Sequence, residues 1–203
     1  MGGNASAHKF NLKDPRDLDA AFRLVFNGGW THSSTGAKPN GSNGYADTKL
    51  IPNSILSNTS AHISKYNRNN DLTGNKIDGA YDNGNTSFFQ QNYSAGNGII
   101  GSISNIVSYT QTDTRGLFTV TRTSSTSLKV FKNSTQQEST NKVTSTSIPN
   151  LAVYIGARNE FAPSFYNSYE SAFASIGDGL TDTEAANFYT AVQTFQTTLG
   201  RQV

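Results

Sequence analysis

The chain has 203 residues, of which 34% are hydrophobic and 15% charged, and its formal net charge is +2. About a third of the residues are Ser, Thr or Asn, far above average usage, and cysteine is absent. This composition excludes a coiled coil, a helical bundle and a disulfide framework. The small net charge argues against nucleic-acid binding, and no segment has the ~18 apolar residues that membrane insertion by a helix needs.

The first half of the chain alternates turn signals with short apolar segments. Residues 1–9 are expected to form a flexible leader. Asn-Gly steps, which tolerate the positive φ of tight turns, begin at Asn27, Asn40, Asn43, Asn83 and Asn97. Thr and aromatic residues favour strands, so the segments around these turns are predicted strands: 20–26, 45–51, 61–67, 75–81 and 99–109.

In the second half the alternation is clearer. Segments 115–122, 127–131, 151–157 and 171–176 are predicted strands, and in 127–131 Leu128 and Val130 point inward. Short alternating strands at regular spacing, with turn residues between them, are typical of an antiparallel β-sandwich. We therefore expect residues 10–179 to form a sandwich.

Residues 180–203 are predicted to form one amphipathic helix. Thr181 and Glu184 have the spacing of a capping box, and Gly200 is a suitable stop. Apolar positions alternate at three and four residues along one side: Ala185, Phe188, Val192, Phe195 and Leu199. This stripe needs a partner, which is either the sheet of its own sandwich or the same helix in neighbouring copies.

The sequence offers little for catalysis. The three histidines are His8, His32 and His62, and none accompanies a G-x-S-x-G elbow. A retaining glycosidase needs two carboxyl groups about 5 Å apart. Asp182 and Glu184 are explained by the helix N-terminus, so only a cross-strand pair stays open. We expect a non-enzymatic protein, with a glycan hydrolase as an alternative.

Two acidic clusters are candidate calcium sites. Asp14, Asp17 and Asp19 form one, and Asp178, Asp182 and Glu184 form the other. Neither has EF-hand spacing, and a solvated turn and a helix cap explain them. No cofactor is expected, and calcium stays an open alternative.

Aromatic residues beside Asn- and Asp-rich turns are typical of sugar sites. Trp30, the single tryptophan, lies in the Gly-rich turn NGGWTHSS, and it is either a stacking platform or a plug over the end of the sandwich. Histidine near this turn is alternatively a hydrogen-bonded structural residue. The candidate ligand-binding residues are Trp30, His32, Tyr45, Asp47, Tyr66, Tyr81 and Asn83.

A family resemblance covers nearly the whole chain after the leader, including the front segment 20–50 (AAFRLVFNGGWTHSSTGAKPNGSNGYADTKL), and two later segments carry it in detail. Residues 116–159 (GLFTVTRTSSTSLKVFKNSTQQE…LAVYIGARN) resemble the back half of concanavalin A-like, laminin-G-like modules. Residues 173–203 (FASIGDGLTDTEAANFYTAVQTFQTTLGRQV) look like the closing strand and terminal helix of that module in proteins of bacteriophages and their hosts. The E-x-D-x-x-E strand of the glycosidases of that superfamily is missing from this sequence.

The resemblance implies a jelly-roll sandwich in a virion component, such as a tail fibre, tail tip or capsid spike. Its partners would be other virion proteins and a host-surface polysaccharide, and avidity would favour a homo-oligomer. A purely structural decoration or assembly protein without a ligand is the alternative, because a fold does not by itself confer a function.

Overall fold

The computed structural model describes residues 3–82, 86–93, 98–141 and 147–203. Its elements in chain order are α1 (Ala5–His8), a 3₁₀ turn (Asp19–Ala21), β1 (Val25–Asn27), β2 (Trp30–His32), β3 (Ala37–Pro39), β4 (Tyr45–Asp47), α2 (Pro52–Ile55), β5 (Ala61–Asn67), β6 (Lys76–Asp82), β7 (Thr86–Tyr93), β8 (Gly98–Ile103), β9 (Ile106–Thr110), β10 (Gly116–Ser124), β11 (Ser127–Lys132), β12 (Thr135–Thr140), β13 (Tyr154–Ile155), β14 (Arg158–Asn159), β15 (Pro163–Ser164), β16 (Ser171–Gly177) and α3 (Asp182–Thr198).

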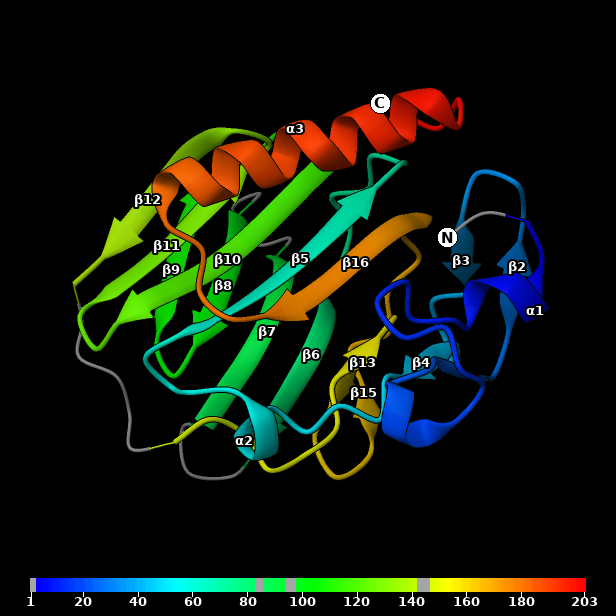
Figure 1. The fold of residues 1–203 in the computed structure, drawn as a ribbon, viewed down its shortest axis with the longest axis horizontal. Helices are drawn as coiled ribbons and strands as arrows, with labels where there is room; N and C mark the ends of the chain where they lie inside the picture. The colour runs from blue at the N-terminus through cyan, green and yellow to red at the C-terminus, as the bar shows by residue number, and fades with distance from the viewer. Residues whose placement is uncertain (1–2, 83–85, 94–97, 142–146) are drawn as a thin grey trace.

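The strands form two sheets that pack face to face (Figure 1). The first sheet has the order β1-β4-β13-β6-β7-β8-β9, with β14 and β15 attached beside β6. The second has the order β12-β11-β10-β5-β16-β3-β2. All strand pairs except β14 with β6 are antiparallel. The predicted antiparallel sandwich with a C-terminal helix is confirmed.

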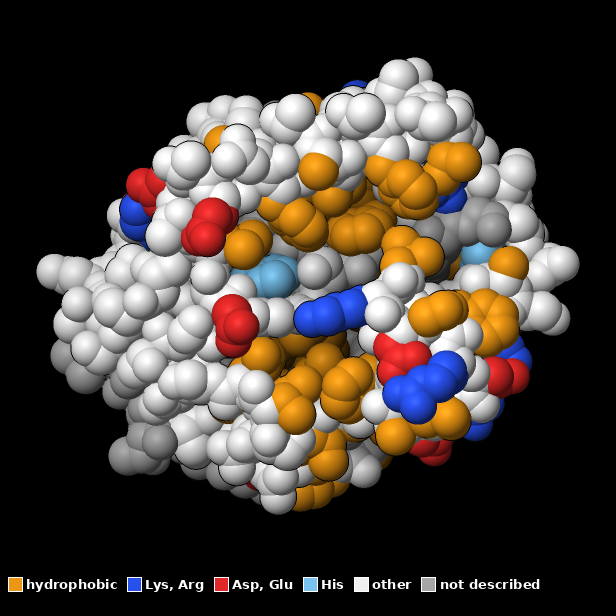
Figure 2. Space-filling model, in the orientation of Figure 1, with side chains coloured by type: hydrophobic (Ala, Val, Ile, Leu, Met, Phe, Trp, Pro, Cys, Tyr) orange, Lys and Arg blue, Asp and Glu red, His pale blue; other side chains and the backbone are white. Residues whose placement is uncertain are grey.

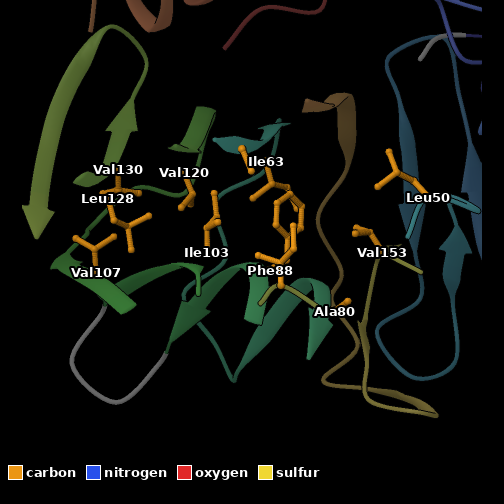
Figure 3. Close-up of a cluster of buried hydrophobic side chains, with 12 residues drawn as sticks. Leu50, Ile63, Ala80, Phe88, Ile103, Val107, Val120, Leu128, Val130 and Val153 are labelled. Carbon is orange, nitrogen blue, oxygen red and sulfur yellow. The ribbon is translucent and has the colours of Figure 1, made fainter. Parts of the chain in front are cut away.

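The main core lies between the sheets, where alternate residues of each strand meet (Figure 3). Ile63 and Val120 of the second sheet face Phe88 and Ile103 of the first, and all four side chains are buried. The inward positions predicted for Leu128 and Val130 are confirmed, since both belong to this cluster. Burying side chains of this size is the main stabilising contribution, at roughly 1.5–3 kcal/mol each.

The helix α3 lies across the outer face of the second sheet (Figure 1). Thr181 and Glu184 form the predicted capping box. Gly200 has a φ of 65° and ends the helix in a Schellman motif, in which the amides of Gly200 and Arg201 bond the carbonyls of Thr197 and Gln196. Val192 packs with Tyr66 and Leu117 in a second cluster, so the helix docks on its own sandwich.

Four predicted elements differ in the structure, one of them being the segment 45–51, in which only β4, Tyr45–Asp47, is a strand. The strand predicted at 20–26 is a 3₁₀ turn that ends at Phe22, whose φ is 55°, followed by the short β1. The strand predicted at 99–109 is the hairpin β8–β9, because Ser104, at a φ of 57°, reverses the chain. The segment 151–157 contributes only the two residues of β13.

The segment predicted as a leader contains the short helix α1. Asn4 caps α1 by accepting a hydrogen bond from the Ala7 amide, and His8 is buried. A ring nitrogen of His8 lies 2.8 Å from one of His32, so this segment closes over the edge of the sandwich. In the part of the chain that the structure describes, no helix has the length and apolar character needed to cross a membrane.

Candidate functional site

A pair of tyrosines with rings in contact lies on the outer face of the first sheet. Tyr45 and Asp47 are two residues apart on β4 and therefore share a face, and Tyr154 of β13 pairs with Asp47. The rings of Tyr45 and Tyr154 have centroids 4.6 Å apart at an interplanar angle of 32°. All three residues are half-buried, so part of each side chain faces solvent.

Charge next to this pair is held in place by local turn geometry. The Lys49 ammonium lies 3.0 Å from the Asp47 carboxylate, which also accepts a hydrogen bond from the Lys49 amide. Burial, together with the nearby Asp47 carboxylate and Tyr45, raises the pKa of Tyr154. The Tyr154 hydroxyl therefore keeps its proton at neutral pH and can donate a hydrogen bond.

An arginine sandwiched between aromatic rings continues the same face. The Arg158 guanidinium lies 5.0 Å from the ring centroid of Tyr81 and 4.3 Å from that of Phe165. Glu160 forms an ion pair with Arg158, and its carboxylate also accepts a hydrogen bond from Ser164. These contacts fix the guanidinium between the two rings, a geometry in which cation–π attraction is favourable.

Sheet register brings the two groups together. Tyr154 and Arg158 both pair with Gly79 of β6, and Tyr81 lies two residues further along that strand. Since paired residues and residues two apart point the same way, all of these side chains lie on one face. We call this set the tyrosine face: Tyr45, Asp47, Tyr81, Tyr154, Arg158 and Phe165.

The backbone beside this face is strained. Lys49, Phe161 and Phe165 have φ values of 58°, 63° and 51°, in the left-handed region that side chains disfavour. Phe161 and Phe165 are 64% and 40% exposed. Strained conformations and exposed aromatic residues both concentrate at functional sites, so the two observations point to the same surface.

Trp30 and His32 lie elsewhere, on β2 at the edge of the second sheet. The Trp30 ring packs edge-on against Phe26 with centroids 4.9 Å apart, and its indole N–H donates to the carbonyls of Asn27 and Tyr45 at 3.0 and 3.3 Å. A Cβ at Gly156 would lie 3.1 Å from the Trp30 ring. Of the two alternatives for Trp30, a stacking platform or a plug over the end of the sandwich, this packing corresponds to the plug.

Tyr66 also lies outside the tyrosine face. It is fully buried beneath α3, where its hydroxyl donates to the Gln193 side chain at 2.9 Å and accepts from the Val203 amide at 2.9 Å. A buried, fully bonded hydroxyl is not available to a ligand, so the predicted ligand contact at Tyr66 does not fit this placement. Asn83 lies outside the described residues.

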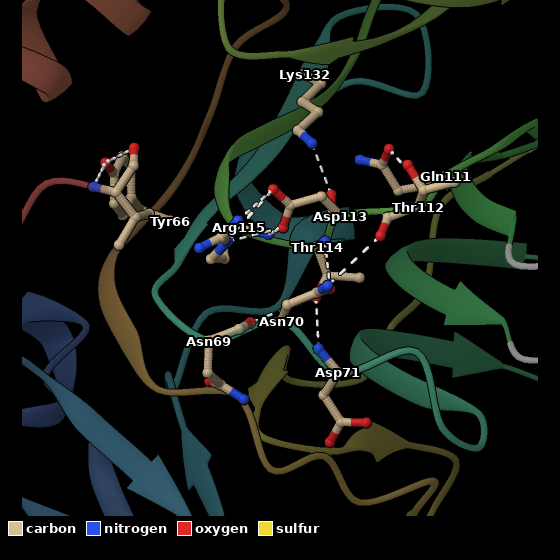
Figure 4. Close-up of polar contacts among 11 residues, drawn as sticks. Tyr66, Asn69, Asn70, Asp71, Gln111, Thr112, Asp113, Thr114, Arg115 and Lys132 are labelled. Carbon is tan, nitrogen blue, oxygen red and sulfur yellow. Dashed lines mark hydrogen bonds and ion pairs between the residues drawn. The ribbon is translucent and has the colours of Figure 1, made fainter.

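A polar cluster joins the β5–β6 and β9–β10 loops at one rim (Figure 4). The Asn70 side chain accepts hydrogen bonds from the backbone and hydroxyl of Thr114, and Arg115 forms an ion pair with Asp113. Lys132 donates to the Asp113 carbonyl at 2.7 Å. These groups form hydrogen bonds and ion pairs with one another, so the cluster holds the two loops together.

Residues of both acidic clusters considered as calcium sites form ion pairs with Lys and Arg side chains. Asp17 pairs with Lys9 and Arg23, and Asp182 pairs with Lys129. Across the described ranges, no group of three or more His, Asp or Glu side chains has the arrangement of a metal site.

Comparisons with known proteins identify the fold. No protein-family model and no curated protein matches the sequence. The structure is similar to the binding domain of botulinum neurotoxin serotype D, with a TM-score of 0.54 at 10% identity over 85% of this chain and 48% of that one. The serotype D/C binding domain gives a TM-score of 0.58 at 11% identity over 86% and 49%.

A sialidase of Trypanosoma rangeli gives a TM-score of 0.52 at 10% identity over 84% of this chain and 30% of that one. This chain therefore spans about half the length of the neurotoxin chains and less of the sialidase. At these identities the likeness shows the architecture alone. The protein has the β-sandwich fold of these binding domains.

Proposed function

We propose that this protein is a non-enzymatic, lectin-like module that binds a host-surface glycan through the tyrosine face. The observation that carries the proposal is the half-buried Tyr45–Tyr154 pair, whose rings pack at a tilt beside the Asp47 carboxylate. Sugar rings present apolar faces that pack on aromatic rings, while fixed polar groups bind their hydroxyls. Structural similarity to neurotoxin binding domains supports a binding role.

Binding to a glycan array and to host polysaccharide tests the proposal. Tyr154→Ala and Tyr45→Ala should each weaken binding by about fivefold, because a lost ring contact is worth ~1 kcal/mol and 1.4 kcal/mol is tenfold. Phe195→Ala is the control. Phe195 is an aromatic residue as exposed as Phe165 of the tyrosine face, at 38% against 40%, but it lies on α3. Binding unchanged by both tyrosine variants would overturn the proposed site.

We further propose that the module belongs to a virion, with other virion proteins as partners and a homo-oligomeric state. This part rests on the resemblance of segment 173–203 to the end of concanavalin A-like modules in proteins of bacteriophages and their hosts. Measuring the native mass of the assembled particle, and the number of copies of this chain in it, tests this proposal. A monomer that is not incorporated into particles would contradict it.

A second candidate function is purely structural, with α3 contacting a neighbouring copy. It is favoured by an apolar groove of about 230 Å³ between α3 and the N-terminal segment, where Leu12 is 70% exposed (Figure 2). Phe173, Phe188 and Phe195 line this groove. In this case particles should lose stability without the protein, while the detached protein should bind neither arrays nor host cells.

Glycan hydrolysis is the alternative that similarity to a sialidase keeps relevant. Incubation with a polysaccharide that the protein binds should release no reducing ends if the module only binds. Release of reducing ends that is abolished by a substitution on the tyrosine face would replace the proposed function with a hydrolase.

A further inference from the structure

Three polar side chains meet in the interior, away from the tyrosine face. Lys65 comes from β5 of the second sheet, Asp78 from β6 of the first, and Asn167 from the segment before β16. Their exposed fractions are 1%, 4% and 0%. A buried lysine, carboxylate and carboxamide in contact need an account, because burying charge is costly even when it is paired.

The Asp78 carboxylate joins the other two groups. One of its oxygens accepts a hydrogen bond from the Lys65 ammonium at 2.7 Å, and the other accepts one from the Asn167 amide nitrogen at 2.9 Å. The second oxygen also accepts from the Gly156 amide at 2.7 Å, which fixes the carboxylate. The carboxyl group therefore bridges an amine and a carboxamide nitrogen.

The Asn167 carbonyl oxygen is also held. It accepts a hydrogen bond from the Tyr169 backbone amide at 3.3 Å. The ring of Tyr169 lies 5.3 Å from the Lys65 nitrogen and helps to close the site from water. A backbone N–H on a carbonyl oxygen stabilises the negative charge that develops there when a nucleophile adds to the carbon.

Burial changes the chemistry of the amine. It lowers the pKa of Lys65, and attraction to Asp78 only partly opposes that shift. Transfer of one proton from Lys65 to Asp78 converts a buried ion pair into a neutral amine and a carboxylic acid. A desolvated neutral lysine is a nucleophile, and a carboxylic acid beside it can act in general acid–base catalysis.

We propose that Lys65 and Asn167 form an intramolecular amide cross-link, with Asp78 transferring the protons. The Lys65 nitrogen attacks the Asn167 side-chain carbonyl carbon and gives a proton to one Asp78 oxygen. The other Asp78 oxygen gives its proton to the Asn167 nitrogen, the carbon–nitrogen bond of the carboxamide breaks, and ammonia leaves. Atoms and charge balance, and no oxidant or further reactant is needed.

Intact mass of the denatured full-length protein tests the proposal. Lys65→Arg, which keeps a cation but cannot form the amide, is made in parallel so that shared processing cancels. Relative to the mass of its own sequence, the wild type should be lighter by one ammonia, whereas Lys65→Arg and Asn167→Ala should show their full masses. Tryptic digestion of the wild type should give a linked pair of peptides, 50–68 with 159–201.

Lys76→Arg is the matched control, because the Lys76 nitrogen is also buried and lies 5.5 Å from the Tyr169 ring but pairs with Asp71. It should keep the loss of ammonia. A wild type at its full sequence mass would overturn the proposal. A loss of water instead would do so too, because it would mean condensation of Lys65 with Asp78. Mass is read on denatured protein, so a variant that folds poorly still gives an answer.

Discussion

Tyrosines lie on the outer faces of both sheets, in opposite settings. On the second sheet, Tyr66 is covered by α3 and its hydroxyl is bonded to Gln193 and Val203. On the first sheet, the rings of Tyr45 and Tyr154 pack against each other at a tilt and stay half-buried. The residue type is the same, so its role depends on whether another element of the fold covers that face.

The largest expected effect separates the two faces by stability. Tyr66→Ala should lower the free energy of unfolding by about 3–5 kcal/mol, because it leaves a cavity beneath α3 and unpaired polar groups. Tyr154→Ala should cost less than about 1 kcal/mol, since its ring is half-buried and packs chiefly on another surface ring. Urea unfolding of both variants measures the difference. Equal losses would mean that the first face is also part of the core.

Removing the cap of α3 should have an intermediate effect. Thr181→Ala deletes the side chain that accepts from the Glu184 amide, at an expected cost of about 1 kcal/mol. Thr181→Ser retains the hydroxyl and is the control. If α3 only rests loosely on the sheet, Thr181→Ala will lower helix content without shifting the global unfolding midpoint.

Acid should weaken the edge between the faces, where α1 closes over β2. Burial, and then repulsion from His32, lower the pKa of His8 from 6.5 to about 4. Because the folded state binds its proton less readily, the stability from this contact is complete above pH 6.5 and declines as pH falls toward 4. Unfolding midpoints at pH 7 and pH 5 should differ less in His8→Asn than in the wild type. Burial also lowers the pKa of His62, but His62 is present in both proteins and contributes equally to the pH dependence of each.

The smallest effect should come from relieving strain beside the tyrosine face. Phe161→Gly should raise the free energy of unfolding by about 0.5 kcal/mol. Glycine relieves roughly 1 kcal/mol of strain at positive φ, and its entropy cost in the unfolded chain offsets only part of that gain. Glycan binding should weaken at the same time if Phe161 contacts the ligand.

Asn133→Gly is the comparison on the second sheet. Asn133 has a φ of 57°, but its side chain accepts a hydrogen bond from the Leu117 amide at 3.0 Å. Loss of that bond costs about 1 kcal/mol, so this variant should be no more stable than the wild type. Equal gains in both variants would mean that the Asn133 bond contributes nothing.

Local patterns predicted much of the fold. Turn signals on either side led to the prediction of a strand at 61–67, the bounds observed for β5, and the Thr181–Glu184 pair predicted the start of α3. The β8–β9 hairpin was missed because Ser104, unlike Asn or Gly, is not a typical residue at positive φ. The two-residue strands β13 and β14 are too short to produce a period of two.

The site was predicted less well than the fold. Tyr45, Asp47 and Tyr81 were singled out by their turns, and the structure places all three on the tyrosine face. Their partners Tyr154 and Arg158 come from a segment far along the chain, and only sheet pairing brings them there. Tyr66 matched the same pattern, but local sequence does not say which sheet face a distant helix will cover.

The placement of β5 at the middle of the second sheet has a consequence for synthesis. One neighbour, β10, is made some 50 residues later, and the other, β16, more than 100 residues later, as the contact between His62 and Asp178 across 116 positions illustrates. A nascent chain on the ribosome thus carries one edge of this strand unpaired until β16 has emerged. High contact order of this kind slows folding and prolongs exposure of an aggregation-prone edge, so yield in cells should depend on chaperone supply and on translation rate through the codons between β10 and β16.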